Sequence, residues 1–281
     1  MLKQRVITAL VLLAILLPAL FYPSSTPFCV VMLVVVGAAG WEWGRMHGYG
    51  AGWSLFLGVE TGLLCALSWW LDLLAQPPAL LWSLAGAAWV LGGAALLRAG
   101  VGGWQRIPRA VRITGGVLTL WVAYVAICHA RVLGINFLLS VMLLVWTADI
   151  AAYFAGRAFG LRFTKNKLAP SISPGKSWEG VWGGMLGVLL LALCWVAADV
   201  ATQASVASLY TRLAGRGWWL LLLGMVFLAA MSVVGDLVES LVKRSVGVKD
   251  SSALLPGHGG VLDRIDALLP TVPLALMLVS L

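Results

Sequence analysis

Long apolar runs, separated by short polar segments, make up most of this chain. A helix that crosses a bilayer needs about 20 apolar residues, and runs of that kind recur along the whole sequence. We predict an all-α polytopic membrane protein with nine transmembrane helices, at residues 6–22, 27–44, 53–75, 79–97, 113–130, 132–155, 178–198, 217–242 and 267–281.

The cations between these runs predict the orientation. If the N-terminus lies in the cytoplasm, all of the 19 Lys and Arg residues face inward except Arg131, Arg212 and Arg216. Because cytoplasmic loops are enriched in Lys and Arg, we expect a cytoplasmic N-terminus and a C-terminus outside. The first run follows basic residues, as a signal peptide does, but no small-residue cleavage site follows it. We therefore expect a retained helix.

The composition supports a multi-pass membrane protein and narrows its partners. Hydrophobic residues make up 61% of the chain and charged residues 11%, which excludes an ordinary water-soluble domain. The excess of Lys and Arg indicates lipid or nucleotide phosphates and does not require nucleic acid. Four cysteines lie inside apolar runs without CxxC pairing, so neither a disulfide framework nor a thiolate zinc site is indicated.

The acids are concentrated in two regions. Seven of the eleven carboxylates lie in residues 146–182 and 232–266, both at cytoplasmic ends of predicted spans: Asp149, Glu179, Asp236, Glu239, Asp250, Asp263 and Asp266. We expect these two regions to face each other across one site. The chain is accordingly divided into N-terminal transmembrane helices (1–130) and a transmembrane region that carries the chemistry (131–281).

A polar stripe runs along the end of the eighth predicted span. Asp236, Glu239, Ser240 and Lys243 are spaced i, i+3, i+4 and i+7, so they share one helix face. Glu239 and Lys243 also form an i, i+4 pair, which leaves a structural role open for Glu239. Asp236 lies deepest and has no earlier cation on its own helix, so we predict a functional role for it.

A glycine-dense turn, Pro256-Gly257-His258-Gly259-Gly260, follows this helix. Its backbone N–H groups are candidates to approach phosphate oxygens closely. Asp263 and Asp266 come next, at i, i+3. Carboxylates with few nitrogen ligands suit Mg²⁺, and the three histidines are too dispersed for zinc. His258 is either a proton carrier or a residue that stabilises the turn.

The loop before the seventh span is basic. Topology alone explains most of its cations, but Lys176 lies between Ser173, Ser177 and Glu179 at a helix start, where phosphate binding is favourable. On the preceding span, Gly156 and Gly160 favour helix packing over ligand contact. The sequence contains no Walker motif spacing, no GxSxG elbow and no HExxH motif.

These residues resemble the signature of the phosphatidate cytidylyltransferase (CDP-diacylglycerol synthase) family. The resemblance covers about residues 146–270, and Gly175 stands where some members have a second Lys. Its motifs are Ser240-x-x-Lys243-Arg244, Lys249-Asp250-x-Ser252, Pro256-Gly257-His258-Gly259-Gly260-x-x-Asp263-Arg264-x-Asp266, Trp146-x-x-Asp149-x-x-Ala152-Tyr153-x-x-Gly156-Arg157 and Ser173-Pro174-x-Lys176-Ser177-x-Glu179-Gly180.

The resemblance implies a Mg²⁺-dependent nucleotidyltransferase of phospholipid biosynthesis in the bacterial inner membrane. Its substrates would be CTP and phosphatidate, and its products CDP-diacylglycerol and pyrophosphate. A second cation and a homodimer are left open. The resemblance places metal ligands at Asp236 and Asp263. It implies catalytic roles for Asp236, Lys249, Asp250, His258, Asp263, Arg264 and Asp266, and substrate binding by Asp149, Ser173, Lys176, Ser177, Glu179, Lys243, Arg244, Gly257, Gly259 and Gly260.

A secondary transporter is the main alternative, because ionisable residues inside spans also mark transport paths. Transport predicts polar residues at the midplane of several spans together with repeat symmetry. Here the acids gather at one face, and Glu42 and Glu60 are the main exceptions, both interpreted as packed or helix-end residues. A phosphotransferase that uses CDP-lipids is disfavoured, because its DG…AR…G…D…D pattern is not found.

Overall fold

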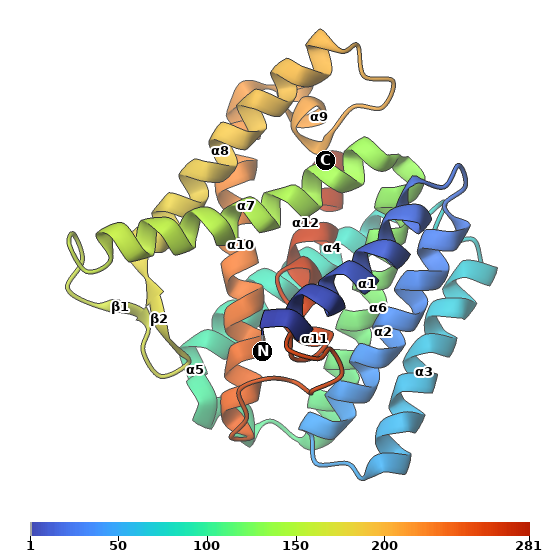
Figure 1. The fold of residues 1–281 in the computed structure, drawn as a ribbon, viewed down its shortest axis with the longest axis vertical. Coiled ribbons are helices and arrows are strands. Elements are labelled where there is room, and N and C mark those ends of the chain that lie inside the picture. The colour runs from blue at the N-terminus through green and yellow to red at the C-terminus, as the bar shows by residue number, and fades with distance from the viewer. Residues whose placement is uncertain (1) are drawn as a thin grey trace.

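The computed structural model describes residues 2–281, with side chains from Lys3 onward. It is an assembly of helices with one short hairpin (Figure 1). Its elements are α1 (Leu2–Phe21), α2 (Thr26–Met46), α3 (Ala51–Trp70), α4 (Ala79–Ala87), η1 (Ala88–Gly92), α5 (Gly93–Arg106), α6 (Arg109–Leu133), α7 (Ile135–Phe159), β1 (Lys167–Ala169), β2 (Ser173–Ser177), α8 (Trp178–Ala201), α9 (Leu209–Arg216), α10 (Trp218–Ser245), α11 (Leu262–Ile265) and α12 (Leu268–Ser280).

Eight helices within residues 2–281 are long and apolar enough to cross a membrane, which confirms an all-α polytopic membrane protein. They are α1, α2, α3, the continuous stretch Ala79–Arg106, α6, α7, α8 and α10. The ninth predicted span forms α12, which has 13 residues. Thirteen residues rise only about 20 Å, less than the ~30 Å apolar core of a bilayer. The predicted count of nine and the outside C-terminus are therefore not confirmed.

The fourth spanning stretch is irregular in two places. Its middle turn, η1, is a π-helix, and Gly100 adopts φ 65° and ψ −167° inside α5. A π-turn widens a helix locally and is frequent at functional sites. The stretch packs against α12 through α4 and against α10 through α5.

Small residues bring α7 and α8 close together. A Cβ atom at Gly184 would lie 2.8 Å from the Ala148 carbonyl oxygen, and one at Gly180 would lie 3.0 Å from that of Ala152. Gly156 continues this contact opposite Gly180, in agreement with its predicted role in helix packing. The contact fixes the start of α8 beside the second half of α7.

One end of the molecule gathers the segments that carry the signature. In Figure 1 the C-terminal ends of α2, α5 and α10 and the start of α6 lie at the same end. The loop after α10, residues 246–261, folds across this end, and we call it the signature loop. Helix α1 also reaches it, because the Thr8 hydroxyl donates a hydrogen bond to the Pro256 carbonyl oxygen at 2.9 Å. The N-terminal helices therefore contact the signature loop directly.

Candidate active site

A cavity of about 420 Å³ lies between α7, β2, the start of α8 and α10. Its charged and hydroxyl-bearing lining residues are Asp149, Tyr153, Arg157, Lys176, Ser177 and Asp236. The hairpin of β1 and β2, which the sequence did not predict, carries Lys176 into this cavity. Ser177 then caps α8 by accepting a hydrogen bond from the Gly180 N–H. The cavity therefore joins the two acid-rich regions, as predicted.

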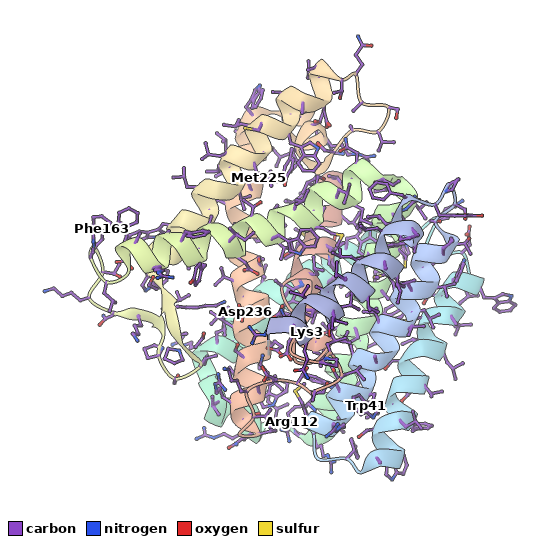
Figure 2. All side chains as sticks on the ribbon, viewed as in Figure 1. Lys3, Trp41, Arg112, Phe163, Met225 and Asp236 are labelled. Carbon is purple, nitrogen blue, oxygen red and sulfur yellow. The ribbon has the colours of Figure 1, made fainter. Side chains whose placement is uncertain are left out.

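Asp236 and Lys176 form an ion pair in this cavity. The Lys176 Nζ atom lies 2.5 Å from one Asp236 carboxylate oxygen, and the Ser240 hydroxyl donates to the other at 3.2 Å. The Asp236 side chain keeps 29% of its surface exposed. Figure 2 shows Asp236 on α10, between Met225 and the end of the helix that carries the signature loop. Its carboxylate thus remains accessible.

Asp266 lies next to Asp236. A Cβ atom at Gly235 would lie 2.6 Å from the Asp266 carbonyl oxygen, so α10 and the start of α12 are in close contact there. Burial raises the pKa of Asp266 to about 7, and the negative charges of Asp236 and Asp149 contribute in the same direction. Asp149 and Asp236 thus line the cavity with Lys176, Asp266 adjoins Asp236, and the like charges of the three carboxylates oppose one another.

A second cluster surrounds Lys243, two turns further along α10. The Lys243 Nζ atom lies 2.5 Å from Glu239 and 2.7 Å from Asp263. Asp263 also accepts hydrogen bonds from the backbone N–H and hydroxyl of Ser251 and from the Gly260 N–H. Burial alone would raise the pKa of Asp263, but the bonds from Lys243 and Gly260 outweigh it and lower the pKa to about 2.

The two clusters are separate. Asp236 and Lys243 are seven residues apart, which is about 10 Å along a helix axis. Asp236 and Asp263 pair with different lysines. Within residues 2–281, no group of three or more His, Cys, Asp or Glu side chains is arranged to hold a metal ion. The predicted pair of metal ligands, Asp236 and Asp263, stays a prediction.

Glu42 of α2 is a packed residue, as the sequence analysis interpreted it, but its contact with the signature loop was not predicted. Its side chain is fully buried and accepts four hydrogen bonds from the signature loop. The donors are the Ser251 and Ser252 hydroxyls and the Val261 and Leu262 N–H groups, at 2.5–3.1 Å. The available signal was a carboxylate inside an apolar span, which by default indicates a function and a partner. The partner lies more than 200 residues away.

The glycine turn uses several of its N–H groups within the protein. Gly257 and Gly259 adopt φ values of 77° and 82°, which favour glycine. The Gly260 N–H donates to Asp263, and the His258 N–H donates to the Leu255 carbonyl oxygen. The predicted phosphate cradle therefore stays a prediction, with Gly257 and Gly259 as its remaining members. His258 accepts through its carbonyl oxygen from Arg264.

The other predicted residues lie around these clusters. Glu179 accepts hydrogen bonds from the N–H groups of Phe163 and Thr164, so it secures the loop before β1. Arg244 donates to the Ile172 and Val248 carbonyl oxygens. Lys249 and Asp250 are exposed in the loop after α10, and Ser173 begins β2. Their roles in substrate binding or catalysis stay predictions.

The donor set near Asp236 suits Mg²⁺, which prefers carboxylate oxygens together with substrate phosphates and water. Asp236 and Asp149 line the cavity and carry such oxygens, but together with Asp266 they do not form a three-ligand group within residues 2–281. Asp263 differs, because Lys243, Ser251 and Gly260 already donate to its oxygens. The site combines accessible acids, one accessible lysine and a position beside membrane-spanning helices, which suits chemistry on a phosphate attached to a lipid.

Comparison with known proteins agrees with this chemistry. The model of the cytidylyltransferase family matches residues 3–281. The chain is 40% identical to a phosphatidate cytidylyltransferase of Pseudomonas aeruginosa, over 97% of this chain and 95% of that protein. It is 37% identical to a phosphatidate cytidylyltransferase of Haemophilus influenzae, over 97% and 96%. This chain belongs to the cytidylyltransferase family, and the resemblance found in the sequence is confirmed.

Proposed function

We propose that this protein is a phosphatidate cytidylyltransferase, which transfers CMP from CTP to phosphatidate and releases pyrophosphate. The observation that carries this proposal is the accessible Lys176–Asp236 pair inside a cavity between the β2 strand and membrane-spanning helices. The two relatives that cover 97% of this chain are named phosphatidate cytidylyltransferase, and they support the proposal. The product is CDP-diacylglycerol, a precursor in phospholipid biosynthesis.

The reaction needs no covalent intermediate on the protein. A phosphate oxygen of phosphatidate attacks the α-phosphorus of CTP, a new P–O–P bond forms, and the bond to the β-phosphate breaks. The electron pair of that bond leaves on pyrophosphate. The protein mainly has to bring two anions together and neutralise the leaving group. Lys176 is positioned to do this, since its ammonium reaches the cavity from the hairpin while Asp236 holds it there.

We assign the binding of Mg²⁺ to Asp236, with Asp149 and Asp266 beside it. When bound, Mg²⁺ would offset the charge that accumulates on the phosphates. Burial raises the pKa of Asp266, and the negative charges of Asp236 and Asp149 raise it further; this concentration of like charge supports the assignment. Lys243 of α10 and Asp263 of α11 form a separate ion pair, which ties the loop between these helices to α10.

We place the site on the cytoplasmic side of the bacterial inner membrane. The ends of α2, α5 and α10 gather Arg45, Arg106, Lys243 and Arg244, and positive residues favour the cytoplasmic side. CTP is a cytoplasmic nucleotide, so this orientation gives it direct access to the cavity.

The test uses the purified full chain in nanodiscs that contain phosphatidate. With CTP labelled at the α-phosphate, we expect label in the lipid extract when Mg²⁺ is present and none when EDTA is added. In a second experiment with CTP labelled at the γ-phosphate, the label should appear only in pyrophosphate. Absence of labelled lipid, together with solute uptake by proteoliposomes, would establish the transporter instead.

A further inference from the structure

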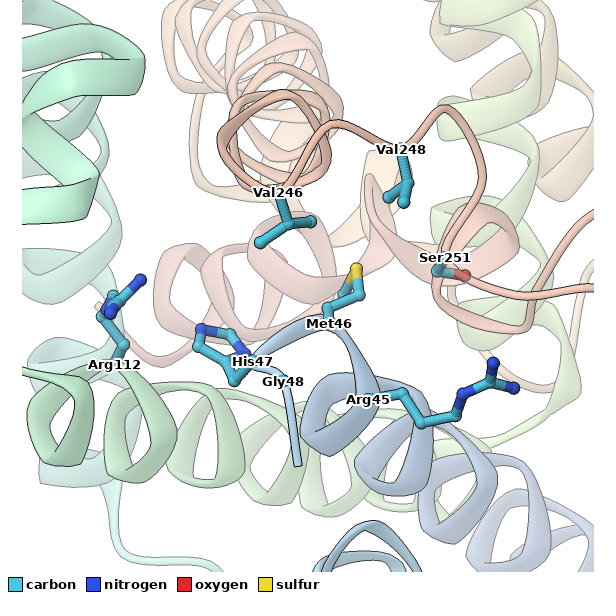
Figure 3. A pocket seen from close by; sticks show the side chains of 8 residues that line it. All are labelled: Arg45, Met46, His47, Gly48, Arg112, Val246, Val248 and Ser251. Atoms are coloured by element: carbon cyan, nitrogen blue, oxygen red, sulfur yellow. The ribbon is translucent and has the colours of Figure 1, made fainter. Parts of the chain in front are cut away.

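The signature loop stands over a cavity where it leaves α10. This cavity has a volume of about 420 Å³ and lies between the loop and the end of α2 (Figure 3). Val246, Val248 and Ser251 line it from the loop, and Met46 and His47 line it from the end of α2. A segment with a cavity on one side has few packing contacts there, so its position depends on contacts made elsewhere.

Glu42 attaches the segments on both sides of the glycine turn, but not the turn itself. Its four donors belong to two residues before the turn and two residues after it. Inside the turn, the Leu255 N–H donates to the Gly259 carbonyl oxygen and the His258 N–H donates to the Leu255 carbonyl oxygen. These two bonds shape the turn without tying it to a membrane-spanning helix. The turn therefore needs a further contact to fix its place.

Helix α1 provides this contact (Figure 1). The Thr8 hydroxyl donates a hydrogen bond of 2.9 Å to the Pro256 carbonyl oxygen. A Cβ atom at Gly257 would lie 2.8 Å from Arg5 Cγ, 3.4 Å from the Arg5 backbone nitrogen and 3.6 Å from Arg5 Cα. Arg5 and Thr8 are spaced i, i+3, so they lie on one face of α1. The glycine turn thus rests directly on the backbone of this helix.

The burial of α1 is concentrated at the same place. Of residues 3–17, only Thr8, Ala9 and Leu16 are partly buried, and all the others are exposed. Leu16 packs against the hydrophobic core near the far end of the helix. In the first half of α1, partial burial is therefore confined to Thr8 and Ala9, where the helix meets the glycine turn. Helix and turn hold each other.

We propose that α1 positions the glycine turn: Thr8 holds Pro256 by its hydrogen bond, and the helix backbone at Arg5 supports Gly257. Both residues of α1 lie outside the family signature and act through the turn, so they are positioning residues. The turn then presents the N–H groups of Gly257 and Gly259 to the phosphates of CTP. This consequence for turnover rests on the proposed function, whereas the attachment of the turn to α1 does not.

Hydrogen exchange tests the attachment without any substrate. In the full chain in nanodiscs, the Leu255, His258 and Gly260 N–H groups are hydrogen-bonded, so their exchange reports opening of the turn. Thr8→Val removes the donor but keeps the side-chain shape, and it should speed this exchange about 5-fold, the effect of one lost hydrogen bond. Thr8→Ser should exchange as the wild type does.

Thr202→Val is the matched control for the loss of a hydroxyl. The Thr202 hydroxyl donates to the Ala198 carbonyl oxygen of its own helix, at the other end of α8 from Lys176. This variant should leave exchange in the turn unchanged. Equal exchange in Thr8→Val and wild type overturns the proposal.

A double-mutant cycle tests the contact at Gly257. Gly257→Ala adds a Cβ atom against Arg5 and strains a residue with a φ of 77°, so exchange in the turn should rise. Arg5→Ala removes the Cγ atom that the new Cβ meets, and it should reverse the rise by about 3-fold. Gly247 has a similar φ of 74°, and a Cβ atom there meets nothing within 4 Å. Arg5→Ala should therefore not change the effect of Gly247→Ala. The same effect of Gly257→Ala with and without Arg5 overturns the contact.

Steady-state kinetics test the consequence for turnover. Thr8→Val should raise the KM for CTP about 5-fold while kcat stays within about 2-fold, and Thr8→Ser should restore the KM. Simple loss of folded protein would instead lower the apparent kcat and leave the KM unchanged. A raised KM with unchanged exchange would overturn the positioning role, and faster exchange with an unchanged KM would overturn the link to CTP. A wild-type protein without turnover would refute the proposed function, while the exchange measurements would still decide the attachment.

Discussion

Asp236 and Asp263 come from the same signature, yet their surroundings are opposite. The Asp236 side chain is 29% exposed and contacts one ammonium group and one hydroxyl. The Asp263 side chain is 6% exposed and receives hydrogen bonds from Lys243, Ser251 and Gly260. The motif alone does not distinguish the two acids. The number of donors around each carboxylate does: Asp236, with few donors, is available to the substrate, and Asp263, with many, holds the loop.

The comparison predicts its largest effect for Asp236→Asn. Loss of the accessible carboxylate should lower kcat by roughly 1,000-fold, the size of effect seen when a group that stabilises developing charge is removed. The melting temperature should stay within about 2 °C, because a partly exposed ion pair contributes little to stability. Asp72→Asn, in the exposed turn after α3, is the control for loss of one acid. Wild-type turnover by Asp236→Asn would contradict the claim that Asp236 acts on the substrate while Asp263 holds the loop.

Glu42→Ala should act on stability. It removes the acceptor for two hydroxyls and leaves the Val261 and Leu262 N–H groups buried without a partner. We expect a loss of about 3 kcal/mol in the free energy of unfolding, and faster proteolysis within residues 246–261. Glu60→Ala, on an exposed position of α3, is the control. If the loop of Glu42→Ala resists protease as well as the control does, this carboxylate does not hold it.

Lys176→Ala should weaken binding while the fold is retained. A hydrogen bond to a charged group contributes about 2 kcal/mol, so the KM for CTP or phosphatidate should rise roughly 30-fold. Lys176→Arg should recover part of the affinity. Lys167→Ala is a control from the same hairpin, because Lys167 is exposed on β1. Unchanged KM values for both substrates would indicate a structural role for Lys176.

The smallest effect is the change in stability that Asp266 causes between pH 6 and 7. Its pKa in the folded protein, about 7, lies above the ordinary value of 3.8, so folding favours the protonated form. Stability without Mg²⁺ should therefore fall as pH rises from about 4 to about 7. Between pH 6 and 7 the loss is at most about 1.4 kcal/mol. Melting curves of wild type and Asp266→Asn measure it. Equal pH dependence in the two proteins would show that Asp266 is not the group that titrates.

Much of the architecture was predictable because bilayer thickness fixes the length of apolar runs. The meeting of Lys176 and Asp236 was also predictable, since both lie near span ends that the basic loops place on one side. The hydrogen-bond partners of Asp263 and Glu42 were not predictable from the sequence. Glu42 pairs with backbone N–H groups, which no residue type reveals, and the contact depends on how α2 packs against the loop. The hairpin was missed because its strands, of three and five residues, are too short for a recognisable alternation.

The bond between Glu42 and the signature loop has a consequence for genetics and for protein engineering. During synthesis, α2 is complete long before residues 251–262 leave the ribosome. The Glu42 carboxylate therefore has no hydrogen-bond donor from this loop until late in synthesis. A fragment that starts after α3 would retain every motif residue and still lack the acceptor. We expect such a fragment to be inactive alone and to regain activity when the missing helices are coexpressed. Inactivating substitutions should accordingly be found at Glu42, outside the motif.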